Sequence, residues 1–173
     1  VRIANGYFPN GGELGSDKYA YKQAWWKRLR NWLDSNVKPT DAFALLGDYN
    51  VAPRAIDLAK PDAWLDTPMY DPVSRAAMEQ VVAFGLHDAV RHVRGDEPGL
   101  YSWWDFRTMG FQKGDGLRID HVYVTAPLLP RVISIRSIEF SGMVDRSTCD
   151  MSISFSRRPL TKIRVWELAS PRS

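Results

Sequence analysis

Asp48 and Asn50 are the first candidates for chemistry, because they directly follow a short apolar run. Residues 42–46 read Ala-Phe-Ala-Leu-Leu and predict a strand that is buried on both faces. Loops at the end of a rigid scaffold often carry catalytic groups. In an extended segment, residues two apart project from the same side, so Asp48 and Asn50 could converge on one metal-bound phosphate. An Asx turn that closes the strand explains the same pair without catalysis.

Asp120 is a second candidate, since it places a carboxylate in the otherwise apolar segment 119–125. Burying a carboxylate costs free energy unless it holds a cation, a histidine or a metal ion. A structural ion pair with Arg118 or another arginine would explain Asp120 equally well. His121 alternates to the opposite face of the strand, so we interpret it as structural, like the other two histidines.

Segment 101–107, Tyr-Ser-Trp-Trp-Asp-Phe-Arg, is an aromatic cluster with a polar rim. Such clusters can stack on bases or wedge into a duplex, although core packing explains most of them equally well. Trp103 and Trp104 are adjacent and cannot both face one core if they lie on a strand. We therefore expect one of them at the surface.

The candidate residues must be held by a scaffold, and the spacing of apolar residues predicts one in which strands and helices alternate. Apolar residues recur at helical spacing from Tyr19 to about Asp34, which predicts an amphipathic helix with a basic outer side. Together, the predicted elements indicate a layered α/β or α+β domain. The basic residues of that helix are Lys18, Lys22, Lys27, Arg28 and Arg30; a second helix is predicted over 73–84, and strands over 1–5, 42–46, 100–104, 119–125 and 132–140.

Composition restricts the class of protein without deciding its partner. A chain of 173 residues that is 45% hydrophobic can bury a core and suits one domain or most of one. The single cysteine excludes an internal disulfide framework and fits a reducing compartment, so we expect a cytoplasmic protein. A net charge of +3 favours polyanionic partners. No apolar run approaches the roughly 20 residues that span a bilayer, so no membrane partner is expected.

Four segments occur in the order and approximate spacing of one family: 5–11 (Asn-Gly-Tyr-Phe-Pro-Asn-Gly), 47–50 (Gly-Asp-Tyr-Asn), 101–107 and 116–120 (Gly-Leu-Arg-Ile-Asp). On these residues the chain resembles exodeoxyribonuclease III, the bacterial abasic-site endonuclease and 3′-exonuclease of the endonuclease/exonuclease/phosphatase superfamily. The second segment is shared across the superfamily, whereas the last two point to its DNA-repair branch. The resemblance covers roughly the first 129 residues.

The resemblance implies an α+β fold, a four-layer α/β/β/α sandwich, which would be incomplete over residues 1–140 and followed by a divergent tail over 141–173. It implies catalytic roles for Tyr7, which matches a tyrosine that hydrogen-bonds the scissile phosphate, and for Asp48, which matches the carboxylate that orients or deprotonates water. Asn50 matches the neighbouring carboxamide on the phosphate or metal side.

Further roles follow from the same resemblance. Asp120 matches the aspartate that positions the catalytic histidine, and Asn10 falls at a polar phosphate contact. Trp103 and Leu117 match residues near the abasic-nucleotide pocket. Mg²⁺ (or Mn²⁺), held at Asp48 and Asn50, would neutralise the charge that develops on the phosphate. The implied partner is double-stranded DNA, especially abasic sites and 3′ ends, bound by a monomer.

Two parts of the family pattern are absent from this sequence. The family's metal-binding glutamate lies in an earlier segment, and the chain opens at Val1 within an apparent strand, so we expect an N-terminal truncation. The family's catalytic histidine has no counterpart near residues 143–151, where neither Asp145 nor Asp150 can replace an imidazole. We therefore expect impaired activity. The alternatives are a non-catalytic DNA-binding remnant and a sister phosphoesterase acting on lipid or inositol headgroups.

Overall fold

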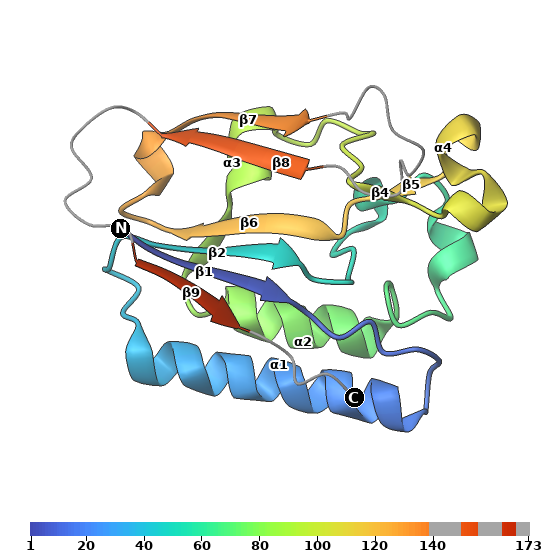
Figure 1. Ribbon diagram of the computed structural model, residues 1–173, viewed down its shortest axis with the longest axis horizontal. Helices are drawn as coiled ribbons and strands as arrows, with labels where there is room; N and C mark the ends of the chain where they lie inside the picture. Colours follow the sequence, from blue (N-terminus) through green and yellow to red (C-terminus); the bar gives the residue numbers. More distant parts are fainter. Residues whose placement is uncertain (139–149, 156–163, 169–173) are drawn as a thin grey trace.

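The computed structural model describes residues 1–138, 150–155 and 164–168, and a five-stranded sheet lies at its centre (Figure 1). The strand order is β3-β6-β2-β1-β9. β1 runs parallel to β2 and β9, whereas β6 runs antiparallel to β2 and β3. β2 is thus the central strand that its apolar run predicts. The strands are β1 (Arg2–Tyr7), β2 (Phe43–Asp48), β3 (Leu86–Asp88), β6 (Asp120–Thr125) and β9 (Arg164–Leu168).

Two helices, α1 (Asp17–Asn36) and α2 (Pro72–Val82), cover one face of this sheet (Figure 1). The Oγ of Ser16 accepts a hydrogen bond from the backbone N–H of Tyr19, so a side chain caps the first turn of α1. Asp71 caps α2 in the same manner, and Pro72 occupies the first helical position. Both helices confirm the sequence prediction. Within the described residues, no helix is both long and apolar enough to cross a bilayer.

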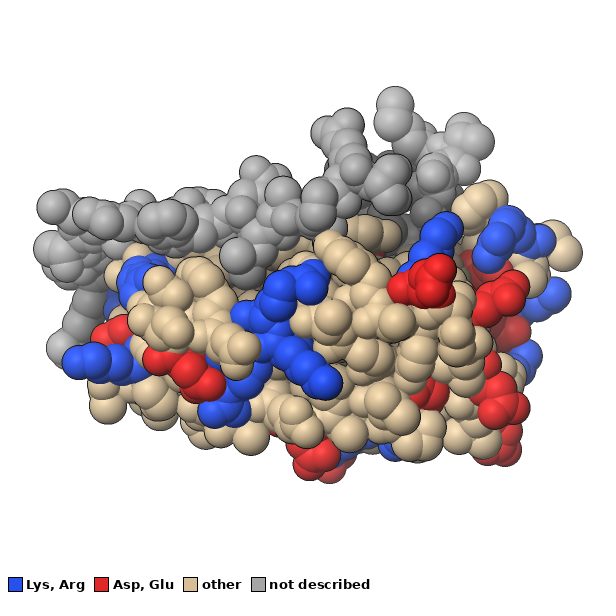
Figure 2. All heavy atoms as spheres, turned by 90° about the horizontal axis from the view of Figure 1, so that it is seen from below, with Lys and Arg blue, Asp and Glu red and all other residues tan. Residues whose placement is uncertain are grey.

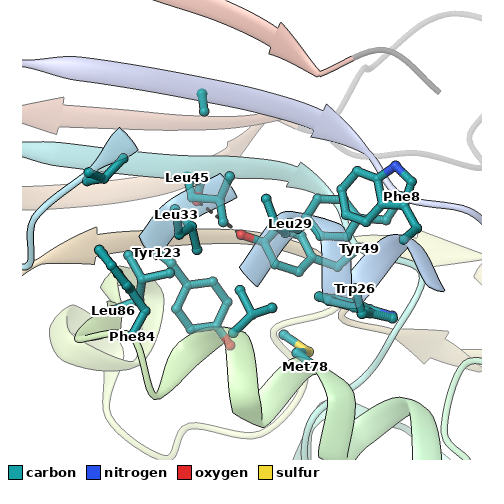
Figure 3. Packing of buried hydrophobic residues seen from close by; sticks show 14 of the residues in the cluster. Phe8, Trp26, Leu29, Leu33, Leu45, Tyr49, Met78, Phe84, Leu86 and Tyr123 are labelled. Carbon is teal, nitrogen blue, oxygen red and sulfur yellow. Dashed lines mark hydrogen bonds between the residues drawn. The ribbon is translucent and has the colours of Figure 1, made fainter. Parts of the chain in front are cut away.

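The main core lies between the two helices and the sheet (Figure 3). Phe8 stacks on Tyr49, with ring centroids 4.0 Å apart, and its ring also lies 4.9 Å from that of Trp26 on α1. The hydroxyl of Tyr49 donates a hydrogen bond to the carbonyl of Leu45. Phe8 and Tyr49 immediately follow β1 and β2, so the core anchors the chain where both strands end.

A second apolar cluster lies on the opposite face of the sheet. Ala44 of β2 and Val122 and Val124 of β6 pack there with α3 (Ala89–Arg94) and the residues that follow β6. Beyond it, β7 (Val132–Ile138) pairs antiparallel with β8 (Asp150–Phe155) as a separate small sheet (Figure 1). A helix layer, the main sheet and a second small sheet are thus present, and this mixed, layered fold agrees with the predicted class.

Short elements gather at the end of the molecule towards which β1 and β2 run (Figure 1). β4 pairs antiparallel with β5, and Leu58 bridges to Leu117 of β5. These elements lie near the C-terminal ends of β1 and β2, where the candidate residues are. The short elements are β4 (Trp103–Trp104), β5 (Gly116–Leu117), α4 (Gly110–Lys113), and the 3-10 turns η1 (Ala55–Asp57), η2 (Pro61–Trp64) and η3 (Phe106–Thr108). A further 3-10 turn, η4 (Leu129–Arg131), follows β6 at the opposite end of the sheet.

Several elements differ from the prediction. The strand expected over 100–104 forms only at its last two residues, which pair with β5. β3 and α3 were not predicted, since each is too short to show a period. Residues 141–173 include β8 and β9, and their divergence from the family stays a prediction. The segment expected to lack the catalytic histidine, 143–151, lies outside the described residues up to position 149.

Gly47 lies where β1 passes close to β2, and it generates a stability prediction. Its φ is 137°, and a Cβ atom there would lie 1.9 Å from the carbonyl oxygen of Gly6. We expect Gly47→Ala to lower the free energy of unfolding by about 2–4 kcal/mol, because the methyl group must push the two strands apart. Urea unfolding measures the change.

Gly15→Ala is the matched control. Gly15 also has a positive φ, 79°, but nothing lies within 4 Å of the added Cβ. It should cost only about 1 kcal/mol, from backbone strain alone. Equal losses in the two variants would contradict the close approach of β1 and β2 at Gly47.

Candidate active site

Three of the predicted residues lie side by side in one row of the sheet. Tyr7 at the end of β1 pairs with Asp48 at the end of β2, and Asp48 pairs with Asp120 at the start of β6. Residues directly opposite on neighbouring strands point to the same face of a sheet. The strand register therefore brings together two carboxylates and a phenol that the sequence keeps far apart.

This row faces away from the main core. Side chains alternate along a strand, and the next residues, Phe8, Tyr49 and His121, point to the α1 face and are fully buried. Tyr7 is 60% exposed, whereas Asp48 and Asp120 are partly buried. The row is therefore open to solvent at its tyrosine end and more enclosed at its acidic end.

Asp48 has the electrostatics of a proton acceptor. Burial raises the pKa of its carboxyl to about 6, although the backbone N–H of Asn50 and the positive charge of Lys22 act in the opposite direction. The N–H of Asn50 donates to Oδ1 of Asp48 over 2.8 Å. A carboxylate with a pKa close to neutral can take a proton from water at working pH, which suits a general base.

Asn50 departs from the predicted geometry. Its φ is 50°, so the segment is not extended, and the expectation that Asp48 and Asn50 project together from an extended strand is wrong. The Asx turn offered as the alternative is present, through the Asn50 N–H bond to Asp48. The Asn50 side chain is buried, and its Nδ2 donates to the carbonyl of Phe8 over 2.9 Å. Asn50 thus ties the loop after β2 to the loop after β1.

Asn10 joins the site through Asn50. The Nδ2 of Asn10 donates to Oδ1 of Asn50 over 3.1 Å, and Oδ1 of Asn10 accepts from the N–H of Gly12. Asn10 is exposed, so its side chain can still meet a ligand. The two predicted asparagines therefore form one hydrogen-bonded pair beside the row.

Lys22 is a site residue that the sequence analysis misplaced. It was expected on the basic outer side of α1, but it is fully buried, and its Nζ donates to the carbonyls of Asn10 (3.1 Å), Asn50 (2.9 Å) and Pro68 (2.7 Å). Burial lowers its pKa to about 7, against the opposing effect of two carboxylates. The missed signal is its spacing, since Lys22 lies one helical turn before Trp26 on the apolar stripe of α1.

The remaining basic residues of α1 do form the expected basic surface. Figure 2 shows Lys and Arg side chains near the middle of the face seen from below, where α1 lies. Lys18, Lys27 and Arg28 are exposed on this helix, and the Arg28 guanidinium lies 5.1 Å from the centre of the Tyr21 ring. Because α1 covers the face opposite to the row, this surface is not part of the candidate site.

The backbone around Asp120 is fixed by the aromatic segment. The Oγ of Ser102 accepts hydrogen bonds from the N–H groups of Ile119 (3.1 Å) and Asp120 (3.0 Å). Ser102 is itself buried, so the segment that precedes β4 holds the start of β6. The Ser-Trp-Trp and Leu-Arg-Ile-Asp motifs are therefore in direct contact.

Arg118 forms ion pairs with Asp57 and Asp88 and not with Asp120, which was the alternative that the sequence offered. It lies 2.8 Å from a carboxylate oxygen of Asp57 and 2.8 Å from one of Asp88, and Arg91 also contacts Asp57. Burial favours a raised pKa at Asp57, but the charge and hydrogen bonds of the two arginines outweigh it and lower the pKa. Asp57 and Asp88 thus account for the buried Arg118 without Asp120.

Trp103 and Leu117 pair across β4 and β5. Trp103 is partly buried and meets Trp64 edge-on, with centroids 6.0 Å apart, whereas Trp104 contacts Tyr101 and Phe111. The two tryptophans thus have different neighbours, as alternation requires, although neither is fully exposed. Leu117 is fully buried, so it supports the Trp103 region from within rather than offering a surface.

The carboxylates of the row could supply only part of the ligands of a metal ion. Among the residues that the structure describes, no group of three or more His, Cys, Asp or Glu side chains is arranged to hold a metal. Mg²⁺, however, binds commonly through one or two carboxylates and completes its shell with water and substrate phosphate oxygens. Asp48, with Asp120 opposite it, meets that smaller requirement.

Known proteins are similar to this chain in sequence and in fold. A family model described as the endonuclease/exonuclease/phosphatase family matches residues 2–141. Exodeoxyribonuclease III of Haemophilus influenzae is 29% identical over 142 residues, which are 78% of this chain and 53% of that protein. An exodeoxyribonuclease of Streptococcus pneumoniae is 30% identical over 148 residues, 85% of this chain and 53% of the relative. The chain thus spans about half the length of these curated relatives.

Solved structures show the same similarity. An AP endonuclease from Archaeoglobus fulgidus superposes with a TM-score of 0.82 at 28% identity, covering 89% of this chain and 62% of its own. The 3′-5′ exonuclease NExo of Neisseria meningitidis also gives a TM-score of 0.82, at 29% identity, with 87% and 59% covered. The predicted fold and the resemblance to exodeoxyribonuclease III are therefore confirmed.

His121, behind the row, generates a pH prediction. It is fully buried, its Nε2 lies 2.8 Å from the carbonyl of Val51, and burial lowers its pKa from 6.5 to about 4. The unfolded chain binds the proton more readily than the folded chain does. The stability that neutral His121 contributes is therefore fully present above pH 6.5 and is lost as the pH falls through 4. We expect this fall in pH to reduce the free energy of unfolding by about 3 kcal/mol through His121.

The measurement compares denaturant unfolding of the parent and of His121→Gln at several pH values. Glutamine keeps an N–H donor for Val51 but does not titrate, so the acid-dependent loss should be smaller in the variant by the amount attributed to His121. His87→Gln, at an exposed position, controls for loss of a histidine. Identical acid dependence in parent and His121→Gln would refute the assignment.

Proposed function

Since this chain belongs to the endonuclease/exonuclease/phosphatase family, we propose that it acts as a metal-dependent DNA phosphodiesterase of the exodeoxyribonuclease III type. The observation that carries the proposal is the row of Tyr7, Asp48 and Asp120, in which a carboxylate with a pKa of about 6 lies between a phenol and a second carboxylate. Phosphodiester hydrolysis needs such groups, to activate water and to hold the phosphate.

In this proposal each residue has a defined task. Asp48 accepts a proton from the attacking water and orients its oxygen towards phosphorus. The exposed phenol of Tyr7 donates a hydrogen bond to a phosphate oxygen, and the amide of Asn10 contacts a neighbouring phosphate. Asp120 would position a catalytic histidine, which is the role that the resemblance implies. Mg²⁺ or Mn²⁺, held by Asp48 with Asp120 opposite it and the carboxamide of Asn50 next to it, would neutralise charge on the phosphate during attack.

Double-stranded DNA is the substrate that the relatives favour. Those named above are described as exodeoxyribonucleases, an AP endonuclease and an exonuclease, and a further NExo structure, with a TM-score of 0.80 at 28% identity, is described as bound to a product DNA hairpin. Trp103 lies at the same end of the molecule as the row, where an aromatic ring could meet an abasic nucleotide. We propose abasic sites and 3′ ends of duplex DNA as targets of a monomer.

We further propose that this chain alone is a slow enzyme. The sequence has three histidines, and of these His121 is buried and points away from the row, whereas His87 and His92 are exposed on β3 and α3. None therefore lies where it could protonate a leaving group beside Asp120. Loss of such an acid or base typically removes a factor of about 10²–10⁴ in rate.

The test is incision of a labelled duplex with one abasic-site analogue, in Mg²⁺ and in chelator. We expect slow, Mg²⁺-dependent cutting that Asp48→Ala lowers by a further factor of about 100, because water then lacks its base. Asp34→Ala, on the exposed face of α1, is the matched control and should cut like the parent.

The other outcomes separate the alternatives. Salt-sensitive duplex binding without cutting would indicate a non-catalytic DNA-binding remnant, since phosphate contacts release counterions. Turnover of a lipid or inositol headgroup without action on DNA would indicate the sister phosphoesterase. Neither binding nor cutting of DNA would refute the proposal.

A further inference from the structure

We propose that Lys22 is a positioning residue, whose ammonium group holds the loops that carry Asn10 and Asn50 in their working arrangement. The loop arrangement is a property of the chain itself. Its consequence for catalysis rests on the proposed function. Lys22 hydrogen-bonds these loops, and its charge also lowers the pKa of Asp48, so it acts on the row as a positioning residue and not as a catalytic one.

The contacts of Lys22 match the capacity of its head group. An ammonium group has three donors and no acceptor. Its three acceptors are the carbonyls of Asn10, Asn50 and Pro68, at 3.1, 2.9 and 2.7 Å. They come from three segments that are distant in sequence: the loop after β1, the loop after β2, and the loop before α2. One side chain of α1 therefore joins all three loops.

The loop after β1 is shaped around the lysine stem. Gly11 has a φ of 95°, and a Cβ atom there would lie 2.9 Å from Cδ of Lys22 and 3.1 Å from Cβ of Pro68. A side chain at Gly11 would therefore collide with the stem and also require a strained backbone. The Oγ of Ser16 lies 3.2 Å from the carbonyl oxygen of Gly11 and 2.7 Å from that of Glu13, so its hydroxyl holds the loop from its other side. Gly11 and Lys22 are thus matched parts of one arrangement.

The arrangement passes from Lys22 to the site side chains. Lys22 holds the backbone carbonyls of Asn10 and Asn50, while their side chains bond to each other and Asn50 also binds the carbonyl of Phe8. The N–H of Asn50 in turn binds Asp48. Without the ammonium group, two buried carbonyls and that of Asn10 would lose a charged donor and turn towards other partners. Asn50 and its bond to Asp48 would then shift.

A merely structural lysine gives a different expectation. If Lys22 served only to fill the space under Gly11, methionine of similar length would preserve both loops. Arginine, with its planar guanidinium, would fit that space less well. The positioning role predicts the reverse order, because arginine keeps a charged donor and methionine has none.

The first experiment measures backbone hydrogen exchange by NMR in the metal-free chain. In Lys22→Met we expect the N–H of Asn50 to exchange at least ~10-fold faster than in the parent. The side-chain amide signals of Asn10 and Asn50 should move towards those of unstructured asparagine, while the N–H groups of central strand β2 stay protected. Lys27→Met, on the exposed side of the same helix, should match the parent.

Two further variants keep the test decisive if Lys22→Met does not fold. Lys22→Arg should retain more of the protection at Asn50 than Gly11→Ala, which displaces the lysine stem. Equal protection of Asn50 in the parent, in Gly11→Ala and in any folded Lys22→Met would overturn the proposal.

The second experiment concerns catalysis and separates this inference from the proposed function. If the parent cuts abasic duplex, Lys22→Met should lower kcat by about tenfold or more while KM changes by less than about threefold, because the groups are displaced rather than lost. Lys22→Arg should recover part of kcat. A parent that does not act on DNA refutes the proposed function, but the exchange measurement still decides the role of Lys22. A change in KM alone would contradict positioning.

Discussion

The register between β1 and β2 is the constraint on which the site depends. It sets Tyr7 opposite Asp48, and Asp48 in turn lies opposite Asp120. A slip of one residue would turn all of these groups to the other face of the sheet. The stacked rings of Phe8 and Tyr49 oppose that slip, because each lies next to a site residue and is fully buried in the main core. The hydrophobic core thereby determines where the polar groups point.

Buried charge gives this part of the molecule a second level of order. Lys22 and Arg118 are both fully buried cations, but they bind different kinds of partner. Arg118 is neutralised by Asp57 and Asp88 and fixes the segment that leads to Asp120. Lys22 binds neutral carbonyls and lies near Asp48, whose pKa its charge lowers. Removing one partner of such a group is costly, because the charge or its acceptors remain buried.

The sequence predicted what depends on local pattern and missed what depends on tertiary contact. The apolar run at 42–46 predicted β2, and helical spacing predicted α1. The motifs placed Tyr7, Asp48 and Asp120 in one site, and the strand pairing brings them together. Lys22 was assigned to the outside of α1, since residue type was given more weight than its place on the apolar stripe. Asn50 was expected in an extended segment, but its backbone is left-handed. The local sequence does not show this, because the Asn50 side chain bonds to Phe8 and Asn10, which are distant in sequence.

The most direct test of the account is the titration of the Asp48 carboxyl carbon by NMR, without metal and with Mg²⁺. The account predicts a midpoint near pH 6 without metal, because the carboxyl is partly buried in the row. It also predicts that Mg²⁺ moves this midpoint down, since a cation favours the ionised form. A midpoint near the ordinary value of 3.8 that does not respond to Mg²⁺ would contradict Asp48 as the centre of a metal-dependent site.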